Sequence, residues 1–274
     1  MRAHWSRTIV TLLPTERADF GFCGMLLFFF FAVGSCGEPK VVRITVPPEK
    51  IQQSAQLVRE GDQFFSRKEY YPALGKYTEA VKLNPNNEYI HNKIGISYSA
   101  LGFFREAEQA VKRSLALNSK YLYAHNNLGT IYFAQGDLGR AIKCFKAAIK
   151  MAPNVASFYV NLGQVYLEKN NFEAAMECLR KAKQLDPAVF SRENSLAIPS
   201  QAGKPNPEKS YSLARIYAAS GDVDRTIKHL ADALLHGFTH LDWVDSETDF
   251  DAIRGDSKFA LFLSEARMKY RASP

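Results

Sequence analysis

Several features that mark familiar classes of protein are missing from this sequence. Only four of its 274 residues are cysteine, which excludes a small fold held together by a disulfide framework. The sequence has no glycine-rich phosphate loop, no nucleophile elbow and no metal-binding helix signature. Long uncharged apolar stretches are also scarce, because Phe20–Val33 is the one run of that kind. The sequence therefore predicts at most one membrane segment and contains no recognised catalytic motif.

The charge of the chain is positive, since 35 Lys and Arg outweigh 28 Asp and Glu to give a formal net charge of +7. Apolar residues make up 46% of the chain and charged residues 23%, which is the composition of an ordinary globular protein. An excess of positive charge favours nucleic acid or anionic lipid as a partner. The choice between them depends on where the protein is located.

Residues 1–35 have the layout of an export signal. Three Arg and two acids precede the apolar run, which is shorter than the roughly 20 residues of a membrane-spanning helix. The run ends in Val33-Gly34-Ser35-Cys36, which resembles the lipobox of bacterial lipoproteins. The resemblance implies cleavage of a signal peptide 1–35 and acylation of Cys36, which would anchor the protein durably in a lipid bilayer.

The alternatives are an uncleaved anchor and an ordinary signal peptide with a chance cysteine. With Cys36 acylated, we expect the protein in a bacterial cell envelope, lipid-anchored and facing the periplasm. Gly37, in place of an aspartate, favours the outer over the inner membrane. Export would remove nucleic acid as a partner. Residues 36–49 are interpreted as the lipidated cysteine and an extended tether, because their three prolines disfavour a helix.

The middle of the chain repeats with a period of 34 residues. Four glycines recur at this spacing, and each is followed after twelve residues by alanine and after sixteen by a larger apolar residue. The glycines are Gly61, Gly95, Gly129 and Gly163, and the larger residues are Tyr77, Val111, Phe145 and Leu179. We interpret each unit as an antiparallel helix pair. Glycine and alanine then stand where the two helices approach closely, since a larger side chain would push them apart.

This framework resembles the tetratricopeptide repeat (TPR) family. The resemblance implies an all-α fold, a right-handed α-α superhelical solenoid. Four clear repeats fill 50–189, and a degenerate fifth covers 207–240. The clear repeats are 54–87, 88–121, 122–155 and 156–189. Residues 190–206, which shift the period by 17, are predicted to be an inter-repeat loop.

Residues 241–274 are predicted to form a C-terminal helical cap, because a solenoid exposes an apolar face at each end. Asp256 is a candidate N-cap for the last helix. The residues suited to cover the exposed end are Trp243, Phe250, Ile253, Phe259 and Phe262.

In TPR arrays the first helix of each pair lines a concave groove that takes a partner protein or peptide. The resemblance implies that the groove residues are Phe65, Tyr89, Asn92, Ile96, Tyr123, Asn126, Thr130, Phe133, Val160, Gln164 and Leu167. Ordinary packing inside the solenoid is the alternative for each of them. The carboxylate-gripping clamp of some TPR proteins is missing, because Val58 and Asp62 stand at its first-repeat positions.

The positions of the histidines and cysteines in the sequence give no reason to expect a cofactor. His91 and His125 hold equivalent positions in adjacent repeats and are interpreted as packing residues. Cys144 and Cys178 are also 34 apart, and helix axes about 9–10 Å apart are too distant for a strain-free disulfide. The histidines and acids of residues 229–256 form no complete ligand set, so no metal ligand and no catalytic residue is assigned.

The favoured function is a non-enzymatic, membrane-tethered periplasmic scaffold or adaptor. It is similar to TPR lipoproteins that assist envelope assembly, such as pilotin-like factors and adaptors for cell-wall hydrolases. The alternative is an enzyme or a metal-dependent accessory subunit with a site around residues 229–256. Formation of a homodimer and the identity of the partner stay open.

Overall fold

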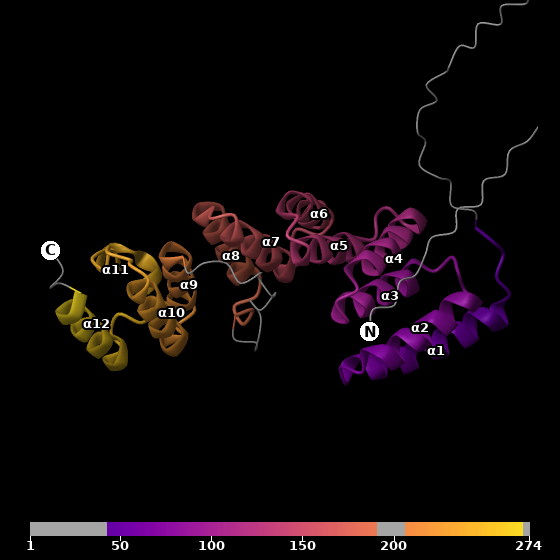
Figure 1. Ribbon diagram of the computed structural model, residues 1–274, viewed down its shortest axis with the longest axis horizontal. Helices are drawn as coiled ribbons and strands as arrows, with labels where there is room; N and C mark the ends of the chain where they lie inside the picture. The colour runs from indigo at the N-terminus through magenta and orange to yellow at the C-terminus, as the bar shows by residue number, and fades with distance from the viewer. Residues whose placement is uncertain (1–42, 191–205, 271–274) are drawn as a thin grey trace, which may run out of the picture. The chain divides into compact units, whose positions relative to one another are not determined.

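The computed structural model describes residues 43–190 and 206–270, and helices are the regular secondary structure of these ranges (Figure 1). Val41–Pro274 forms one compact unit, and this unit contains every described helix and all four buried apolar clusters. Within the described ranges there is no strand, and no helix is long and apolar enough to span a bilayer. The predicted signal peptide, the lipidated Cys36 and residues 191–205 lie outside the described residues.

Ten helices of the described ranges form five consecutive pairs, and each pair packs against the next. The pairs are α1 (Pro48–Ser66) with α2 (Tyr70–Leu83), α3 (Glu88–Ala100) with α4 (Phe104–Leu117), α5 (Leu122–Ala134) with α6 (Leu138–Met151), α7 (Ala156–Glu168) with α8 (Phe172–Leu185), and α9 (Pro207–Ala219) with α10 (Val223–Leu235). The expected all-α array of helix pairs, including the degenerate fifth, is confirmed.

One boundary differs from the expectation. The first helix begins at Pro48, inside the predicted tether 36–49 and before the predicted start of the first repeat. Proline is favoured in the first turn of a helix because the backbone N–H that it lacks would have no partner there. Residues 43–47, just before it, form neither helix nor strand.

The repeated glycines make the close contacts expected of them. A Cβ added to Gly129 would lie 2.7 Å from Cε1 of Phe145, and one added to Gly163 would lie 2.8 Å from Cγ of Leu179. The same contact joins Gly61 to Tyr77 and Gly95 to Val111. In every clear repeat, the large side chain sixteen residues after the glycine therefore packs against that glycine.

The turn inside each pair also repeats. The residues with positive φ at these turns are Lys68, Gly102, Gly136, Asn170 and Gly221. The first four are 34 apart, and Gly221 follows Asn170 by one period plus the 17-residue shift. This left-handed conformation ends a first helix and is easiest for glycine. The fifth pair therefore keeps the repeat's turn although its sequence has diverged.

The C-terminal cap consists of α11 (Trp243–Ser246), the 3₁₀ turn η1 (Thr248–Phe250) and α12 (Ser257–Tyr270). Phe250, Ile253 and Phe259 are buried in one cluster with side chains of α9 and α10, and Phe262 packs at its edge. Trp243 differs from the expectation, because it stays 43% exposed at the rim of this cluster. The carboxylate of Asp256 accepts a hydrogen bond from the Phe259 N–H at 3.0 Å, which confirms it as the N-cap of α12.

Replacing Gly129 with alanine is expected to lower the free energy of unfolding by about 1–3 kcal/mol, because Phe145 occupies the space of the new methyl group. Gly75→Ala is the matched control, since a Cβ on this exposed α2 residue would meet nothing within 4 Å. It should raise the free energy of unfolding by about 0.5–1 kcal/mol. Urea unfolding measures both, and equal stability of the two variants would contradict the assignment.

Candidate partner-binding face

The eleven candidate partner-binding residues lie on the first helices of the four clear repeats, and we call the surface of α1, α3, α5 and α7 the inner face. Tyr123 is the most accessible of them, at 53% exposed. The half-buried ones are Phe65, Tyr89, Ile96, Asn126 and Thr130. The buried ones are Asn92, Phe133, Val160, Gln164 and Leu167. For the buried five, the structure shows the packing inside the solenoid that the sequence left open as the alternative.

Apolar clusters account for three of these buried residues. Phe133 belongs to the cluster built by α4 to α7, while Val160 and Leu167 belong to the next one. That second cluster also contains Phe190 and Ile216, which come from beyond the clear repeats. The fourth clear repeat is therefore closed by its C-terminal neighbours, and the accessible part of the inner face lies on α1, α3 and α5.

A chain of asparagine side chains crosses the inner helices. Nδ2 of Asn127 donates to Oδ1 of Asn92 at 2.9 Å, and Nδ2 of Asn161 donates to Oδ1 of Asn126 at 2.9 Å. A longer bond of 3.4 Å from Asn126 to Asn127 joins the two pairs on α5. These amides link α3, α5 and α7. Sequence reasoning missed Asn127 and Asn161, although their 34-residue spacing could have revealed them.

A second polar centre joins α1, α2 and α3 around the carboxylate of Asp62. This carboxylate accepts hydrogen bonds from the hydroxyls of Tyr77 at 2.5 Å and Tyr89 at 3.2 Å. Nζ of Lys93 lies 2.7 Å from it and also stands 5.0 Å from the ring centroid of Tyr89 and 6.0 Å from that of Phe65. The two aromatic candidates on this part of the inner face are therefore held by one ion pair.

The electrostatics of this centre favour both charged forms. Burial raises the pKa of the Asp62 carboxyl, but hydrogen bonds from Lys93 and Tyr77 lower it by more, so the pKa lies below its ordinary value of 3.8. Burial lowers the pKa of Lys93, but its interactions with Asp62 and Tyr89 together raise it by more, so the pKa lies above its ordinary value of 10.5. The pair is thus ionised at neutral pH and contributes no net charge to the inner face.

Tyr123 offers an aromatic surface at the start of α5. Its ring packs edge-on against Phe158 at 6.2 Å and against Tyr121 at 5.9 Å between centroids. These contacts hold the ring while about half of its surface stays open. An aromatic side chain held in place in this way loses little conformational freedom when it binds a partner.

The inner-face positions of α9 are occupied by the protein itself. Arg215 stands where Gln164 stands in the fourth repeat, and its guanidinium lies 2.8 Å from Asp249 and 2.7 Å from Glu247. Arg180 of α8 adds a third contact, at 3.2 Å from Asp249. The cap is therefore fixed over α9 by ion pairs, and Asp249 is 92% buried among them because only 8% of it is exposed.

The histidines and acids of residues 229–256 do not gather into one site. His229 stacks on Tyr217 and His240 on Trp243. Asp232 lies 3.3 Å from His236, and four other acids of the segment pair with arginines, such as Asp245 with Arg267. Within 43–190 and 206–270, no group of three histidine, cysteine or acidic side chains is arranged to hold a metal.

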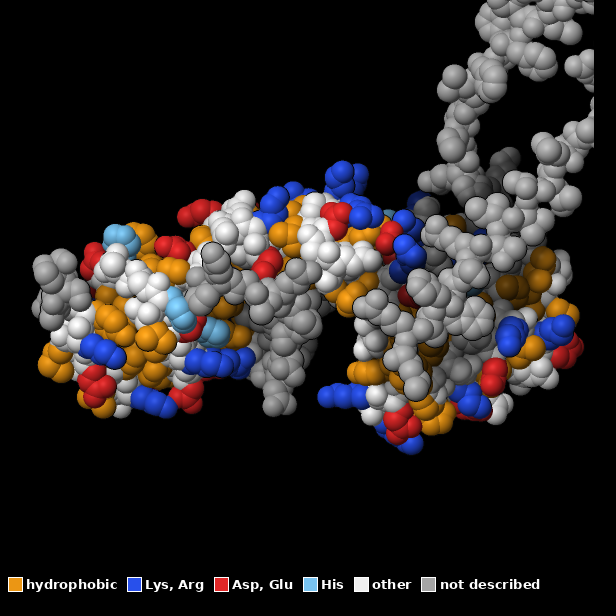
Figure 2. All heavy atoms as spheres, in the orientation of Figure 1, with side chains coloured by type: hydrophobic (Ala, Val, Ile, Leu, Met, Phe, Trp, Pro, Cys, Tyr) orange, Lys and Arg blue, Asp and Glu red, His pale blue; other side chains and the backbone are white. Residues whose placement is uncertain are grey.

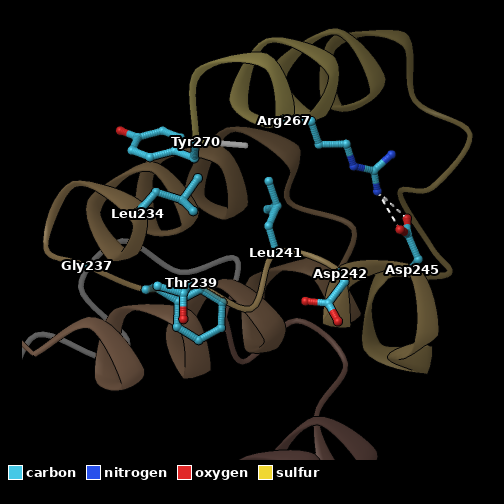
Figure 3. Close-up of a pocket in the computed structure, with 9 residues that line it drawn as sticks. Leu234, Gly237, Thr239, Leu241, Asp242, Asp245, Arg267 and Tyr270 are labelled. Atoms are coloured by element: carbon cyan, nitrogen blue, oxygen red, sulfur yellow. Dashed lines mark hydrogen bonds and ion pairs between the residues drawn. The ribbon is translucent and has the colours of Figure 1, made fainter. Parts of the chain in front are cut away.

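A cavity of about 560 Å³ lies between α10, the loop after it and α12 (Figure 3). Apolar side chains of Leu234, Leu241 and Tyr270 line it beside Asp242 and the Arg267–Asp245 pair. Arg267 bonds both carboxylate oxygens of Asp245, which satisfies that carboxylate. The cavity therefore joins an apolar lining to one neutralised ion pair and shows no nucleophile activated by a base.

The histidines and cysteines of the four clear repeats have the packing contacts expected of them. Nε2 of His91 lies 2.9 Å from the Pro85 carbonyl, and Nε2 of His125 lies 2.9 Å from the equivalent carbonyl of Ser119. Burial lowers the pKa of His91, which disfavours its charged form. Cys144 and Cys178 are free thiols, and burial raises the pKa of each to about 11. Neither thiol is activated as a nucleophile at neutral pH.

Comparison with protein families agrees with this geometry. A tetratricopeptide repeat model matches residues 92–143 and 127–189, and a further TPR model matches 61–102. Residues 61–189 of the chain are therefore tetratricopeptide repeats.

The similar proteins support the fold. The chain is 37% identical over 59 residues to the outer envelope protein 64 of Arabidopsis thaliana chloroplasts, covering 21% of this chain and 10% of that one. A thermophilic TPR protein of Thermus thermophilus is 20% identical with a TM-score of 0.50, covering 78% of this chain and 99% of that one. The pilF protein of Pseudomonas aeruginosa is 16% identical with a TM-score of 0.52, covering 82% and 95%. The two structures share the TPR solenoid fold with this chain.

Asp62→Ala is expected to lower the free energy of unfolding at pH 7 by about 1–3 kcal/mol, because Tyr77 and Lys93 lose their common acceptor. Because the folded pKa of Asp62 is depressed, its contribution is complete above the unfolded value and is lost as the pH falls through the folded value. The difference from the unmodified protein should thus shrink below about pH 4.

Urea unfolding at pH 7 and pH 3 checks this expectation. Glu79→Ala, which removes an exposed carboxylate from α2, is the control and should change stability by less than about 0.5 kcal/mol at either pH. A cost for Asp62→Ala that is the same at both pH values would show that the ion pair does not stabilise the fold.

Proposed function

We propose that this protein is a membrane-tethered periplasmic scaffold that binds a partner protein on the inner face of α1, α3 and α5. The observation that carries the proposal is the accessible, pre-arranged aromatic surface on these helices. Tyr123 is half open and held by two aromatic neighbours, and Tyr89 and Phe65 are held around Lys93. Held side chains bind with a smaller loss of conformational freedom than mobile ones do.

The chemistry of the inner face favours an apolar or amide-bearing segment of the partner. Asp62 and Lys93 neutralise each other, and the asparagines of α3, α5 and α7 are bonded to one another. An acidic C-terminal tail is disfavoured, because Asp62 stands at a position where a carboxylate clamp would need a cation or an amide. A helix or extended segment with apolar anchors therefore fits this surface better than a charged tail.

The localisation part of the proposal is supported by the sequence around Cys36. Its apolar run and its Val-Gly-Ser-Cys ending support an acylated N-terminus, and acylation would confine the scaffold to a membrane surface. Confinement raises the effective concentration of the scaffold for partners on the same surface. A role in envelope assembly, as a pilotin-like factor or an adaptor for cell-wall hydrolases, would use this recruitment.

The partner-binding test compares two aromatic truncations. Tyr123→Ala removes the exposed ring of the inner face, and Tyr71→Ala removes a ring of similar exposure, 66%, from α2 on the other side of the first pair. Immobilised protein is used to capture envelope proteins, which are compared by quantitative mass spectrometry. We expect at least one captured protein to be reduced about tenfold or more by Tyr123→Ala and unchanged by Tyr71→Ala. Equal recovery of every protein with both variants would contradict binding at the inner face.

The tethering test follows a labelled fatty acid in bacteria that express the full chain. We expect the label on the unmodified protein and the protein in the membrane fraction. Cys36→Ala should abolish both, whereas Cys23→Ala, within the predicted signal peptide, should change neither. Label that persists on Cys36→Ala, or its absence from the unmodified protein, would refute acylation at Cys36.

A further inference from the structure

The second helix of the third repeat, α6, has basic residues but no acidic ones. The helix α6 contains Arg140, Lys143, Lys146 and Lys150 and no acidic residue. Arg140 is paired with Asp137 at 2.6 Å. The three lysines are exposed, and no carboxylate among the described residues forms an ion pair with any of them.

On the other second helices some lysines have an acidic partner, whereas others, such as Lys82 of α2 and Lys181 of α8, form no ion pair with a described residue. Lys76 of α2 pairs with Glu60 at 2.7 Å, and Lys112 of α4 pairs with Glu108 at 2.7 Å. The lysines of α6 are spaced by three and four residues, so they share one side of the helix over about 10 Å. Figure 2 shows Lys and Arg side chains gathered over α6, at the top of the view.

The positive surface continues across a cleft to α8. This cleft has a volume of about 650 Å³, and Lys146 of α6 lines it together with Lys181 of α8 and with Arg180, whose charge is shared with Asp249 at 3.2 Å. Tyr159, Leu162 and Tyr166 of α7 line it as well, and Glu177 is its one acidic residue. Nζ of Lys146 stands 6.0 Å from the ring centroid of Tyr166. We call the lysines of α6 and the cations of this cleft the α6 basic face.

Residues 43 and 44 contact the body of the protein before α3 and at the end of α4. The N–H of Ile44 donates to Oδ1 of Asn86 at 3.3 Å, and the guanidinium of Arg43 donates to the carbonyl of Leu117 at 2.5 Å. Leu117 is the last residue of α4, and Lys150 is in the last turn of α6, the equivalent helix one repeat further on.

We propose that the α6 basic face binds the phosphate groups of an anionic lipid bilayer. The choice of a bilayer rests on the membrane tether of the proposed function. Lysine side chains are flexible point charges without the fixed fork of arginine, which suits many mobile phosphates better than one oriented ligand. Each basic residue near an anionic bilayer strengthens binding about fivefold, so the three lysines of α6 together supply on the order of a hundredfold.

The test uses residues 41–274, the compact unit that contains every described helix and lacks Cys36. Its binding to phosphatidylcholine vesicles with and without 30% phosphatidylglycerol is measured by co-sedimentation. We expect binding to the anionic vesicles alone, weakened by added salt because screening acts on exposed charges. Lys143→Gln/Lys146→Gln/Lys150→Gln should reduce it by on the order of a hundredfold.

The matched control is Lys50→Gln/Lys68→Gln/Lys228→Gln, which removes the same charge from exposed lysines elsewhere. It should reduce binding severalfold at most. Equal losses with the two triple variants, or no binding to anionic vesicles, would overturn the proposal. Binding of free glycerol phosphate as tight as that of anionic vesicles would also overturn it, because it would indicate a soluble ligand. Tighter binding of duplex DNA than of anionic vesicles would overturn it as well. Since the fragment lacks Cys36, these outcomes are independent of acylation and of the partner on the inner face.

Discussion

The contact between a glycine and a large apolar side chain sets the geometry on which the rest of the structure depends. In each clear repeat the large side chain of the second helix lies where the glycine of the first helix has no Cβ. The side chains that fill this space are buried completely at Tyr77 and Phe145, and such burial contributes about 1.5–3 kcal/mol for each. Because the contact recurs every 34 residues, it gives each pair the same separation and each inner helix an equivalent position.

The polar contacts of the inner face require this regular spacing. The bonds Asn127–Asn92 and Asn161–Asn126 both join residues 35 apart, from one inner helix to the next, with the same length of 2.9 Å. The centre at Asp62 joins three helices of the first two repeats in a comparable way. An inner helix that shifted by one Cβ diameter would break these bonds, so the order of the partner-binding face follows from the apolar contact inside the pairs.

Periodicity made the fold predictable and the details of the inner face less so. The helix pairs, the glycine contacts and the Asp256 cap follow from residues that recur or have a fixed local role. The ion pair of Asp62 with Lys93 could not be predicted from the period. The positions equivalent to Lys93 in the next two repeats are Asn127 and Asn161, so no lysine recurs there. The burial of Leu167 could not be predicted either. Its position in the repeat predicts the direction of its side chain, but the cluster that buries it also contains Phe190 and Ile216, which lie outside the clear repeats.

The cap defines where the partner-binding face ends. On α9 the inner-face positions are Tyr211, Arg215 and Ala218, and Tyr211 and Ala218 are buried in the same cluster as Phe250. Arg215 is bound by Glu247 and Asp249. A buried ion pair is expensive to break, because the group left behind keeps its desolvation cost. The cap thus occupies the inner-face positions of the fifth helix pair. The candidate residues of the fourth pair are buried, whereas Tyr123 of the third pair stays half exposed. A partner that approaches the inner face therefore meets the first three pairs.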